Sequence, residues 1–393
     1  MQYFATVYFS IFRCTLHGGF YKKGRNMVRV LHVVTYMGRG GLETMLMNYY
    51  RHIDHTKVQF DFLVHRDFEA DYDKEILELG GRVYHISRLI PWSQKYRKEL
   101  KMFFRNHPEY KIVHVHQDCL SAVALQCAKE CGIPVRIAHS HSSGAVKNLK
   151  YPIKMYYMRK IPLYATKLFA CGKQAGDWMF SGKKYEIIKN AIEAEKYQYS
   201  AAIAEEVRSE FGITDEIVIG HVGNFTPAKN HIFMLEIFQK IQKKECKIKM
   251  IFVGGGERIN NIRKKVYEMG MQDQIIFTGR RSDVNRLMQA MDVFIFPSLY
   301  EGVPVTMIEA QAAGLPCVIS DHVPDECITT KDLVIKKRLD EPSDKWAEDI
   351  LQLAQKSRTQ HMEEIKKAGY DIEDAAKQLE EFYFQNGEKQ WHY

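Results

Sequence analysis

Short β-branched runs alternate with longer helical patterns along nearly the whole chain, and this alternation restricts the fold more than any other feature. In the first half the predicted strands are residues 28–35, 59–64, 82–86, 112–116, 135–139 and 167–171. In the second half they are residues 217–222, 249–253, 274–278, 292–297, 316–320 and 333–335. Strands that alternate with helices are typical of βαβ units around a parallel sheet. The predicted fold class is therefore α/β, with two doubly wound parallel sheets.

The chain has 393 residues, more than one hydrophobic core usually serves, so we predict two domains. The predicted parts are a first domain (27–190), a second domain (191–360) and a tail (361–393) whose helix packs back on the first domain. The apolar segment Tyr3–Leu16 is too short to span a membrane and lacks the features of a signal peptide. We interpret residues 1–26 as an extension upstream of a start at Met27, with a loose interfacial anchor as the alternative.

Composition excludes several classes of protein. With 46% hydrophobic and 26% charged residues, the chain has the balance of a soluble globular protein. Its eight cysteines form no CxxC pair, and no His/Cys cluster has metal-ligand spacing along the chain, so we expect reduced thiols, no metal site and a cytoplasmic location.

The net charge of +8 comes from an excess of basic residues in the first half of the chain. In Lys147–Lys167 basic residues interleave with apolar ones at helical spacing, as in helices that lie on membrane surfaces. Peripheral contact with an anionic membrane and a solvated basic face are both open interpretations. No nucleic-acid-binding motif accompanies the charge, so we expect no nucleic-acid partner.

Glycine-rich or basic loops follow several predicted strands, at the edge where parallel sheets bind ligands. The loop YMGRGGLE (36–43) places Gly40 and Gly41 at a helix N-terminus, where backbone amides bind anions, but its spacing is not the GxGxxG of a dinucleotide site. The other loops are GNFTPAKNH (223–231), GGGE (254–257) and GRRSD (279–283). They contribute Asn224, Lys229, Gly254, Arg280 and Arg281. Together these loops predict one phosphate-containing ligand.

The stretch EGVPVTMIEAQAAG (301–314) places two carboxylates around a predicted helix start. Glu301 precedes Pro304, which suits a first helical turn, and Glu309 lies one turn into the helix. Carboxylates accept hydrogen bonds from vicinal hydroxyls, and hydroxyl pairs beside a diphosphate describe a nucleotide sugar. The alternative for Glu309 is a local capping or pairing role.

The segment Pro297–Asp321 resembles the E-x7-E motif of the GT-B glycosyltransferases of family 4. Similar to that family are also GGLE (40–43), HVH (114–116), AHSHS (138–142), KNAIE (189–193) and the lysine of GNFTPAKN. The resemblance spans about residues 27–387 and implies a GT-B fold, in which two Rossmann-like domains face a central cleft.

The resemblance also implies residue roles. It assigns Glu309 to the ribose, Glu301 to the transferred sugar and Lys229 to the leaving diphosphate. It places His139 on the sugar side of the cleft; His139 is preferred to His141 because it ends its strand. The amides expected to approach the diphosphate belong to the Gly40–Gly41 loop and to Val303–Val305, and Gly302 and Pro304 are also predicted to bind the donor. One departure is Asn224, which stands where the family usually has arginine; Arg280 or Arg281 are the candidates to replace that charge.

The implied reaction is retaining, hexosyltransferase-type transfer (EC 2.4) from a nucleoside diphosphate sugar, with a UDP-sugar as the expected donor and no metal requirement. The acceptor would be a carbohydrate or lipid-linked carbohydrate hydroxyl in capsular, exopolysaccharide or lipopolysaccharide synthesis, at the inner membrane face. Two alternatives stay open: a nucleotide-sugar epimerase, and a non-catalytic nucleotide-sugar-binding subunit of a polysaccharide assembly complex.

Overall fold

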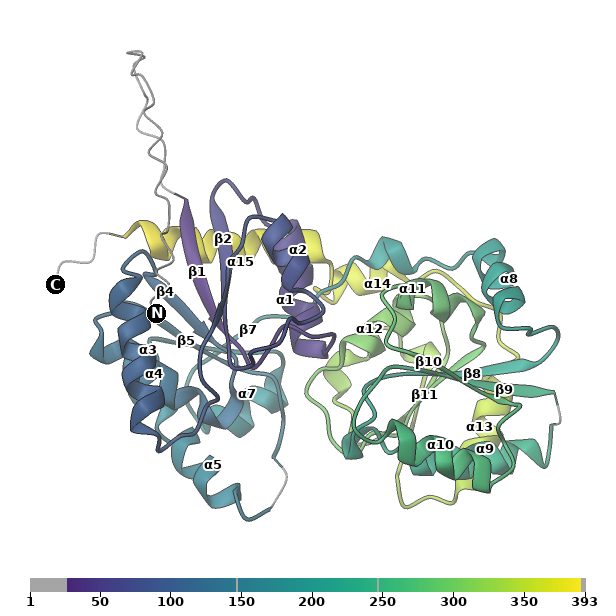
Figure 1. Ribbon diagram of the computed structural model, residues 1–393. Coiled ribbons are helices and arrows are strands. Elements are labelled where there is room, and N and C mark those ends of the chain that lie inside the picture. Colours follow the sequence, from purple (N-terminus) through teal and green to yellow (C-terminus); the bar gives the residue numbers. More distant parts are fainter. Residues whose placement is uncertain (1–26, 146–147, 246, 390–393) are drawn as a thin grey trace, which may run out of the picture.

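The computed structural model describes residues 27–145, 148–245 and 247–389, and it shows two α/β domains side by side (Figure 1). Each domain is built on one parallel sheet, and every strand predicted from the sequence is present. The fold class is therefore confirmed. The predicted extension, residues 1–26, lies outside the described residues.

The first domain has a seven-stranded parallel sheet in the order β3-β2-β1-β4-β5-β6-β7. Its strands are β1 Val28–Val33, β2 Val58–Val64, β3 Val83–His85, β4 Ile112–Val115, β5 Val135–Ser140, β6 Lys167–Ala170 and β7 Glu186–Ile187. Its helices are α1 Gly41–His52, α2 Asp73–Glu78, α3 Gln94–Asn106, α4 Ser121–Glu130, α5 Tyr151–Met158, α6 Ile161–Tyr164 and α7 Lys173–Phe180.

The second domain has a six-stranded parallel sheet in the order β10-β9-β8-β11-β12-β13. Its strands are β8 Ile217–Val222, β9 Ile248–Val253, β10 Ile275–Gly279, β11 Val293–Phe296, β12 Cys317–Ser320 and β13 Val334–Lys337. Its helices are α8 Ala201–Glu210, α9 His231–Gln242, α10 Ile259–Glu268, α11 Val284–Leu287, α12 Val305–Ala312, α13 Ser343–Leu353 and α14 Met362–Lys367.

Helices cover both faces of each sheet, which is why the central strands read as continuous apolar runs rather than alternating ones. In the first domain α1 and α2 cover one face, and α3, α4, α6 and α7 cover the other. In the second domain α8, α11, α12 and α14 cover one face, whereas α9, α10 and α13 cover the other. Each sheet is thus buried between two hydrophobic cores.

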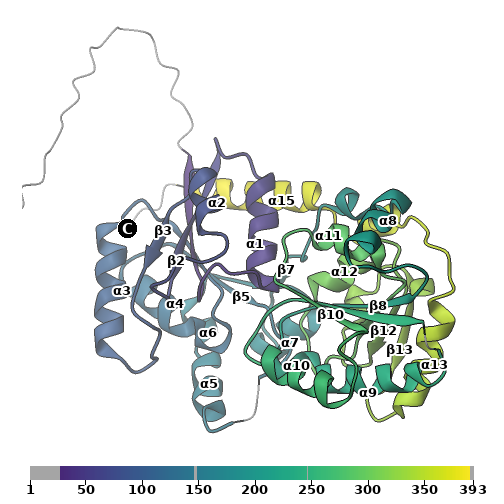
Figure 2. The same ribbon diagram turned by 45° about the vertical axis from the view of Figure 1, so that its right-hand side comes forward.

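The last helix, α15 (Ile372–Glu388), returns to the first domain and lies across α1 and the strands beside it (Figure 2). Its residues Ile372, Leu379 and Tyr383 are buried in the core of that domain. The tail contains two helices, α14 and α15, rather than the one helix predicted from the sequence, because Gly369 takes a left-handed conformation (φ 76°) and separates them.

Two chain segments cross between the domains, and they pair with each other. Ile192 and Asp371 form a parallel bridge, with the backbone N–H of Ile192 bonded to the carbonyl of Tyr370 at 3.0 Å. The tail therefore passes between the domains at residues 370–372, after α14 has packed against α12 of the second domain.

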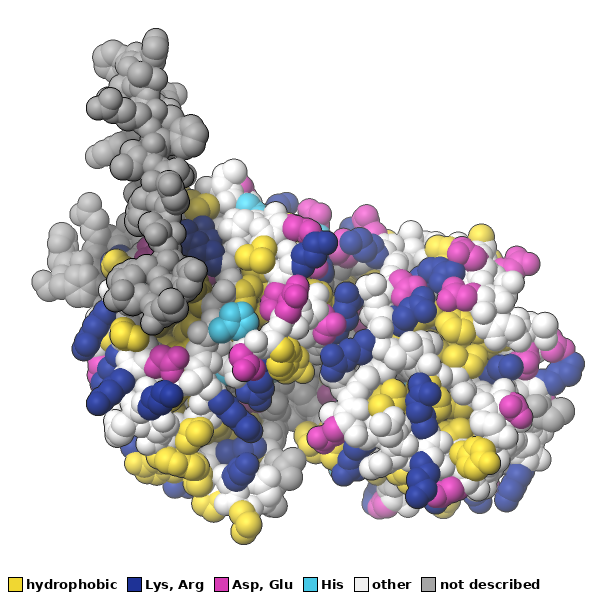
Figure 3. Space-filling model, in the orientation of Figure 1, with side chains coloured by type: hydrophobic (Ala, Val, Ile, Leu, Met, Phe, Trp, Pro, Cys, Tyr) yellow, Lys and Arg dark blue, Asp and Glu magenta, His cyan; other side chains and the backbone are white. Residues whose placement is uncertain are grey.

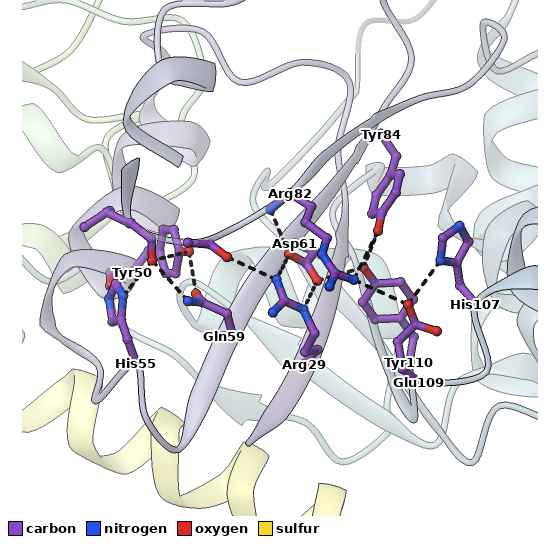
Figure 4. A network of polar contacts seen from close by, with 12 residues as sticks. Arg29, Tyr50, His55, Gln59, Asp61, Arg82, Tyr84, His107, Glu109 and Tyr110 are labelled. Carbon is purple, nitrogen blue, oxygen red and sulfur yellow. Dashed lines mark hydrogen bonds and ion pairs between the residues drawn. The ribbon is translucent and has the colours of Figure 1, made fainter. Parts of the chain in front are cut away.

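A polar network ties β1, β2 and the loop before β4 together (Figure 4). Asp61 is fully buried and accepts two hydrogen bonds from the Arg29 guanidinium, at 2.6 and 2.5 Å. It also accepts from the Tyr110 hydroxyl at 2.7 Å and from the backbone N–H of Arg82 at 2.8 Å. With four donors around it, the buried carboxylate is compensated for its lost hydration.

The carboxyl ends of the two sheets face each other, and the surface between the domains is hollowed (Figure 3). Within the described part of the chain, no helix is both long and apolar enough to cross a membrane. The cysteines at positions 119, 127, 131, 171, 317 and 327 are all free.

Candidate active site

A cavity of about 520 Å³ lies between the two domains, within the size range of small-molecule sites. Its walls come from loops at the carboxyl ends of strands in both sheets. All the residues predicted to bind a donor line it: Gly40, Gly41, Asn224, Lys229, Gly254, Arg280, Arg281, Glu301, Gly302, Val303, Pro304, Val305 and Glu309.

Lys229 and Glu301 form an ion pair in the cavity, with 2.6 Å between Nζ and Oε1. Lys229 ends the 3-10 turn before α9, and Glu301 lies in the loop between β11 and α12. Their side chains are only 17% and 13% exposed, so each charge depends on the other for compensation. Nζ of Lys229 also lies 4.4 Å from the centre of the Phe296 ring, in a cation–π contact.

Glu309 lies in α12 with 5% of its surface exposed. Burial raises the pKa of its carboxyl group to about 7, although the hydrogen bond from Tyr197 acts in the opposite direction. The Tyr197 hydroxyl donates to Oε1 of Glu309 at 2.6 Å. Apart from that bond, the carboxyl faces the cavity and can accept hydrogen bonds from a ligand.

Two helix N-termini converge on the same cavity. α1 begins at Gly41, with Gly40 as its extended N-cap residue, and α12 begins at Val305, directly after Pro304. Unpaired amides and the helix dipole make such positions favourable for anions. The carbonyl of Val303 accepts a hydrogen bond from the Asn190 side chain, which fixes the second of these two turns.

The cations near the cavity differ in how firmly they are held. Arg281 makes two hydrogen bonds of 2.7 Å to Asp283, so its guanidinium is already occupied. Arg280 has a single, long contact of 3.4 Å to Asp71 of the other domain. Arg280 and Arg281 are the candidates to supply the positive charge that Asn224 lacks. Arg280 would lose fewer interactions than Arg281 if it turned towards a ligand.

The loop that carries Glu301 also packs against the first domain. A Cβ added to Gly302 would lie 2.2 Å from the carbonyl oxygen of His141, so only glycine allows this approach. The Ser143 hydroxyl donates to the carbonyl of Glu301. Further along the interface, Glu326 accepts hydrogen bonds from the backbone N–H groups of Lys173 and Gln174 at the start of α7. The cavity is thus formed by two domains in direct contact.

Comparison with known proteins decides the family. The model of the family "Glycosyl transferases group 1" matches residues 203–372, and the model of "Glycosyltransferase Family 4" matches residues 39–196. A relative from Bacillus subtilis (strain 168), "Putative glycosyltransferase EpsF", is 35% identical over 362 residues, covering 88% of this chain and 93% of the relative. The chain belongs to the family 4 glycosyltransferases.

Other similarities agree with this family. The "Capsular polysaccharide biosynthesis glycosyltransferase CapH" of Staphylococcus aureus is 23% identical over 375 residues, covering 91% of the glycosyltransferase described here and 99% of CapH. The structure of Anabaena HepE in complex with UDP and glucose superimposes with a TM-score of 0.71 at 14% identity, covering 91% of this chain and 97% of HepE. The predicted GT-B fold is confirmed.

One predicted residue lies elsewhere in this glycosyltransferase. His139 does not line the cavity; it is fully buried, and His141 lines the cavity instead. The reason is that β5 continues to Ser140, one residue further than predicted, so the residue at the rim is His141. The preference for His139 over His141 is therefore not supported by the geometry.

Sequence reasoning also missed several polar residues of the cavity. Tyr197, the partner of Glu309, has no signal in the sequence, because it lies 112 residues away along the chain. The pair Arg51–Glu75, joined by hydrogen bonds of 2.6 and 2.9 Å, also lines the cavity and comes from two different helices. Asn190 could have been found, since it belongs to the KNAIE segment that was already recognised.

Histidines that have no metal-ligand spacing along the chain nevertheless come together in the described part of the fold. His32, His114 and His116 form one group with ligand-capable atoms within 4.8 Å of one another, and His116, His139 and His141 form a second. These residues are far apart in sequence or alternate along a strand, so a search for linear spacing does not find them. Neighbouring parallel strands bring them together: His32 pairs with His114 in the β1–β4 register.

Proposed function

We propose that the protein catalyses retaining transfer of a hexosyl group from a UDP-sugar to a hydroxyl group of a carbohydrate acceptor during surface polysaccharide synthesis. The observation that carries the proposal is that Lys229, Glu301 and Glu309 line one cavity between two domains. A nucleotide sugar offers each of them a matching group: a diphosphate, the hydroxyls of the sugar and the hydroxyls of the ribose.

Each side chain has a role in the proposed reaction. Glu309 accepts the ribose hydroxyls, and the amides at the starts of α1 and α12 hold the diphosphate. Lys229 neutralises the charge that develops on the diphosphate as the bond between the anomeric carbon and the phosphate oxygen breaks. The acceptor oxygen bonds to the same face of that carbon, and its proton passes to the departing phosphate. Positioning and charge stabilisation supply the rate enhancement.

The ion pair between Lys229 and Glu301 fits this division of roles. Donor binding would separate the two charges, turning Lys229 towards the diphosphate and Glu301 towards the transferred sugar. The structures of HepE with UDP and glucose, and with UDP-glucose, support a uridine nucleotide as donor, and the name of CapH supports a role in polysaccharide synthesis. We assign no metal to the transfer itself, since Lys229 and the helix N-termini can neutralise the diphosphate.

A panel of UDP-, GDP- and ADP-sugars in a thermal-shift assay tests the donor. A ligand at 100 times its Kd stabilises the protein by about 2.7 kcal/mol, so the cognate donor should raise Tm clearly above the other two. No stabilisation by the UDP-sugars would contradict the assignment of the base. Incubating the bound donor with oligosaccharide acceptors then measures transfer. A changed sugar without an acceptor would favour an epimerase, and binding with neither reaction would favour a non-catalytic subunit.

We also propose peripheral contact with an anionic membrane through α5 and its flanks. None of the residues of α5 is buried, and Tyr156 (55% exposed), Leu163 (64%) and Leu149 (99%) present apolar surface beside basic side chains. Yellow and dark blue side chains lie together in Figure 3 where Figure 1 labels α5. Apolar anchors with neighbouring cations favour anionic lipid surfaces.

Sedimentation with vesicles tests the membrane contact. The protein should sediment with vesicles that contain anionic lipid and much less with neutral vesicles. The double variant Leu149→Ser/Leu163→Ser should lose binding while retaining its thermal stability, because both side chains are mostly exposed. Equal binding by the variant would remove α5 and its flanks as the contact.

A further inference from the structure

Five histidines gather in the first domain, next to the cavity wall. His32 lies on β1, His114 lies on β4, His116 follows β4, His139 lies on β5 and His141 follows β5. All but His141 are buried, and each ring lies close to at least one other in the group. This histidine cluster is not explained by the proposed transfer reaction, which uses none of the four buried rings.

Hydrogen bonds arrange the cluster in two rows. In the first row, Nδ1 of His32 lies 3.1 Å from Nε2 of His116, whose Nδ1 lies 2.9 Å from Nε2 of His141. In the second row, the Tyr383 hydroxyl lies 2.6 Å from Nδ1 of His114, whose Nε2 lies 3.1 Å from Nδ1 of His139. The first row ends at His141, which lines the cavity.

We propose that His116, His139 and His141 bind one divalent transition-metal ion at the edge of the cavity. One ring nitrogen from each lies within 4.8 Å of the other two. Tetrahedral coordination at metal–nitrogen distances of about 2.0–2.1 Å needs nitrogens about 3.3 Å apart, so two nitrogens at the 4.8 Å limit must approach each other by about 1.5 Å.

An unpaired nitrogen marks the same place independently. Nδ1 of His139 is occupied by His114, but Nε2 of His139 has no hydrogen-bond partner although the residue is fully buried. A buried polar atom without a partner costs free energy, so such atoms are uncommon in folded proteins. A metal ion bonded to this nitrogen removes that cost, whereas the hydrogen-bonded rows alone leave it.

The neighbouring residues provide the second layer that metal-binding histidines need. Such a histidine usually hydrogen-bonds through its other nitrogen, and this bond fixes the orientation of the ring. His32 makes this contact with His116, and His114 makes it with His139. The alternative triad of His32, His114 and His116 also has an unpartnered buried nitrogen, Nε2 of His32. In that triad His114 would have to give up Tyr383 or His139 to reach an ion, whereas in the chosen triad His116 gives up only its contact with His141, which is itself a ligand.

The ligand set indicates which ions fit. Three imidazoles favour zinc, cobalt, nickel or copper over magnesium and calcium, which prefer oxygen ligands. Because His141 lines the cavity, the fourth coordination position faces it and is open to water or to an oxygen of a bound ligand.

Metal titration of the chelator-treated protein, without a polyhistidine tag, tests the proposal. We expect one equivalent of Zn²⁺ to bind in calorimetry and to remain after dialysis, measured by elemental analysis. Co²⁺ should give the visible absorption of a four-coordinate nitrogen site. The control is His322→Ala, which removes a half-exposed histidine outside the cluster and should bind like the unaltered protein.

Two kinds of variant separate a ligand from a neighbour. His141→Ala and His139→Gln should each weaken Zn²⁺ binding by about 100-fold or more, and His32→Ala by roughly 10- to 100-fold, the cost of losing a hydrogen-bonded partner behind a ligand. His141 is partly exposed, so its variant should fold even if His139→Gln does not, and circular dichroism checks both. Binding of less than one equivalent by the unaltered protein, or unchanged affinity in folded His141→Ala, would overturn the proposal.

Discussion

Glu309→Gln should have opposite effects on donor binding and on stability. Burial raises the pKa of Glu309 from 4.5 to about 7. A raised folded-state pKa means that ionising the carboxyl costs stability once the pH exceeds the unfolded value. A shift of about 2.5 units corresponds to about 3 kcal/mol at pH well above 7, at 1.36 kcal/mol per unit. Glutamine keeps the acceptor for Tyr197 but never carries the charge.

The size of the stability difference changes with pH in a defined window. Below pH 4.5 the carboxyl is protonated in both folded and unfolded chains, so the variant gains nothing there. Between pH 4.5 and about 7 the unaltered protein progressively loses stability that the variant keeps. Above this window the variant should unfold at a Tm several degrees higher, since about 3 kcal/mol corresponds to roughly 6–12 °C for a domain of this size.

Differential scanning fluorimetry of both proteins from pH 5 to pH 9 measures the difference, and calorimetric titration with UDP measures binding. The same carboxylate accepts the ribose hydroxyls in the proposed function, so the variant should bind UDP roughly 10- to 100-fold more weakly, the loss of a hydrogen bond to a charged group. Tyr197→Phe is the matched control: it removes the bond that lowers the pKa of Glu309, so its Tm should fall relative to the unaltered protein. A Tm difference between Glu309→Gln and the unaltered protein that does not grow with pH would refute the reasoning.

Three further variants test other parts of the structure. Lys229→Ala should lower kcat by roughly 10²- to 10³-fold, the scale of losing one partner of transition-state charge, and near-normal turnover would contradict the assignment. Asp61→Ala should lower the free energy of unfolding by about 3–5 kcal/mol in urea titrations, because it leaves Arg29 partly buried without its partner; an unchanged midpoint would mean that the network contributes nothing. Gly302→Ala should raise KM for the donor, because the added Cβ would push the Glu301 loop away from His141; unaltered KM would show that the domain contact is dispensable.

The strands and their division between two domains could be predicted from the sequence, because each strand is marked by a local pattern of residues. Each central strand is buried on both faces, so it leaves a continuous apolar run, and each run is followed by a helical period. The positions of Glu301 and Glu309 followed in the same way, since both flank a helix start marked by Pro304 and a helix end marked by Gly314. The break at Gly369 was missed because a single glycine is also tolerated within a helix.

What the sequence could not predict depends on distance in space rather than along the chain. Tyr197 meets Glu309 only because two segments 112 residues apart fold against each other. Likewise, the choice between His139 and His141 depends on whether β5 ends at residue 139 or 140, and strand ends are uncertain by more than that in any pattern-based prediction. The histidine cluster could have been predicted from the sequences HVH (114–116) and HSH (139–141), because both lie at the ends of strands that were predicted to be parallel.

The ion pair between Lys229 and Glu301 sets a condition on any ligand of the cavity. Both side chains are mostly buried, so if either residue loses its partner, it is left with a charge that is poorly hydrated. A ligand that attracts only Lys229, such as a nucleoside diphosphate, would leave Glu301 unpaired. A diphosphate with a sugar attached supplies an anion for the lysine and hydroxyl donors for the glutamate together. In the proposed function, the pair therefore favours the intact donor over the nucleotide that remains after transfer, which is the preference that a transferase needs to release its product.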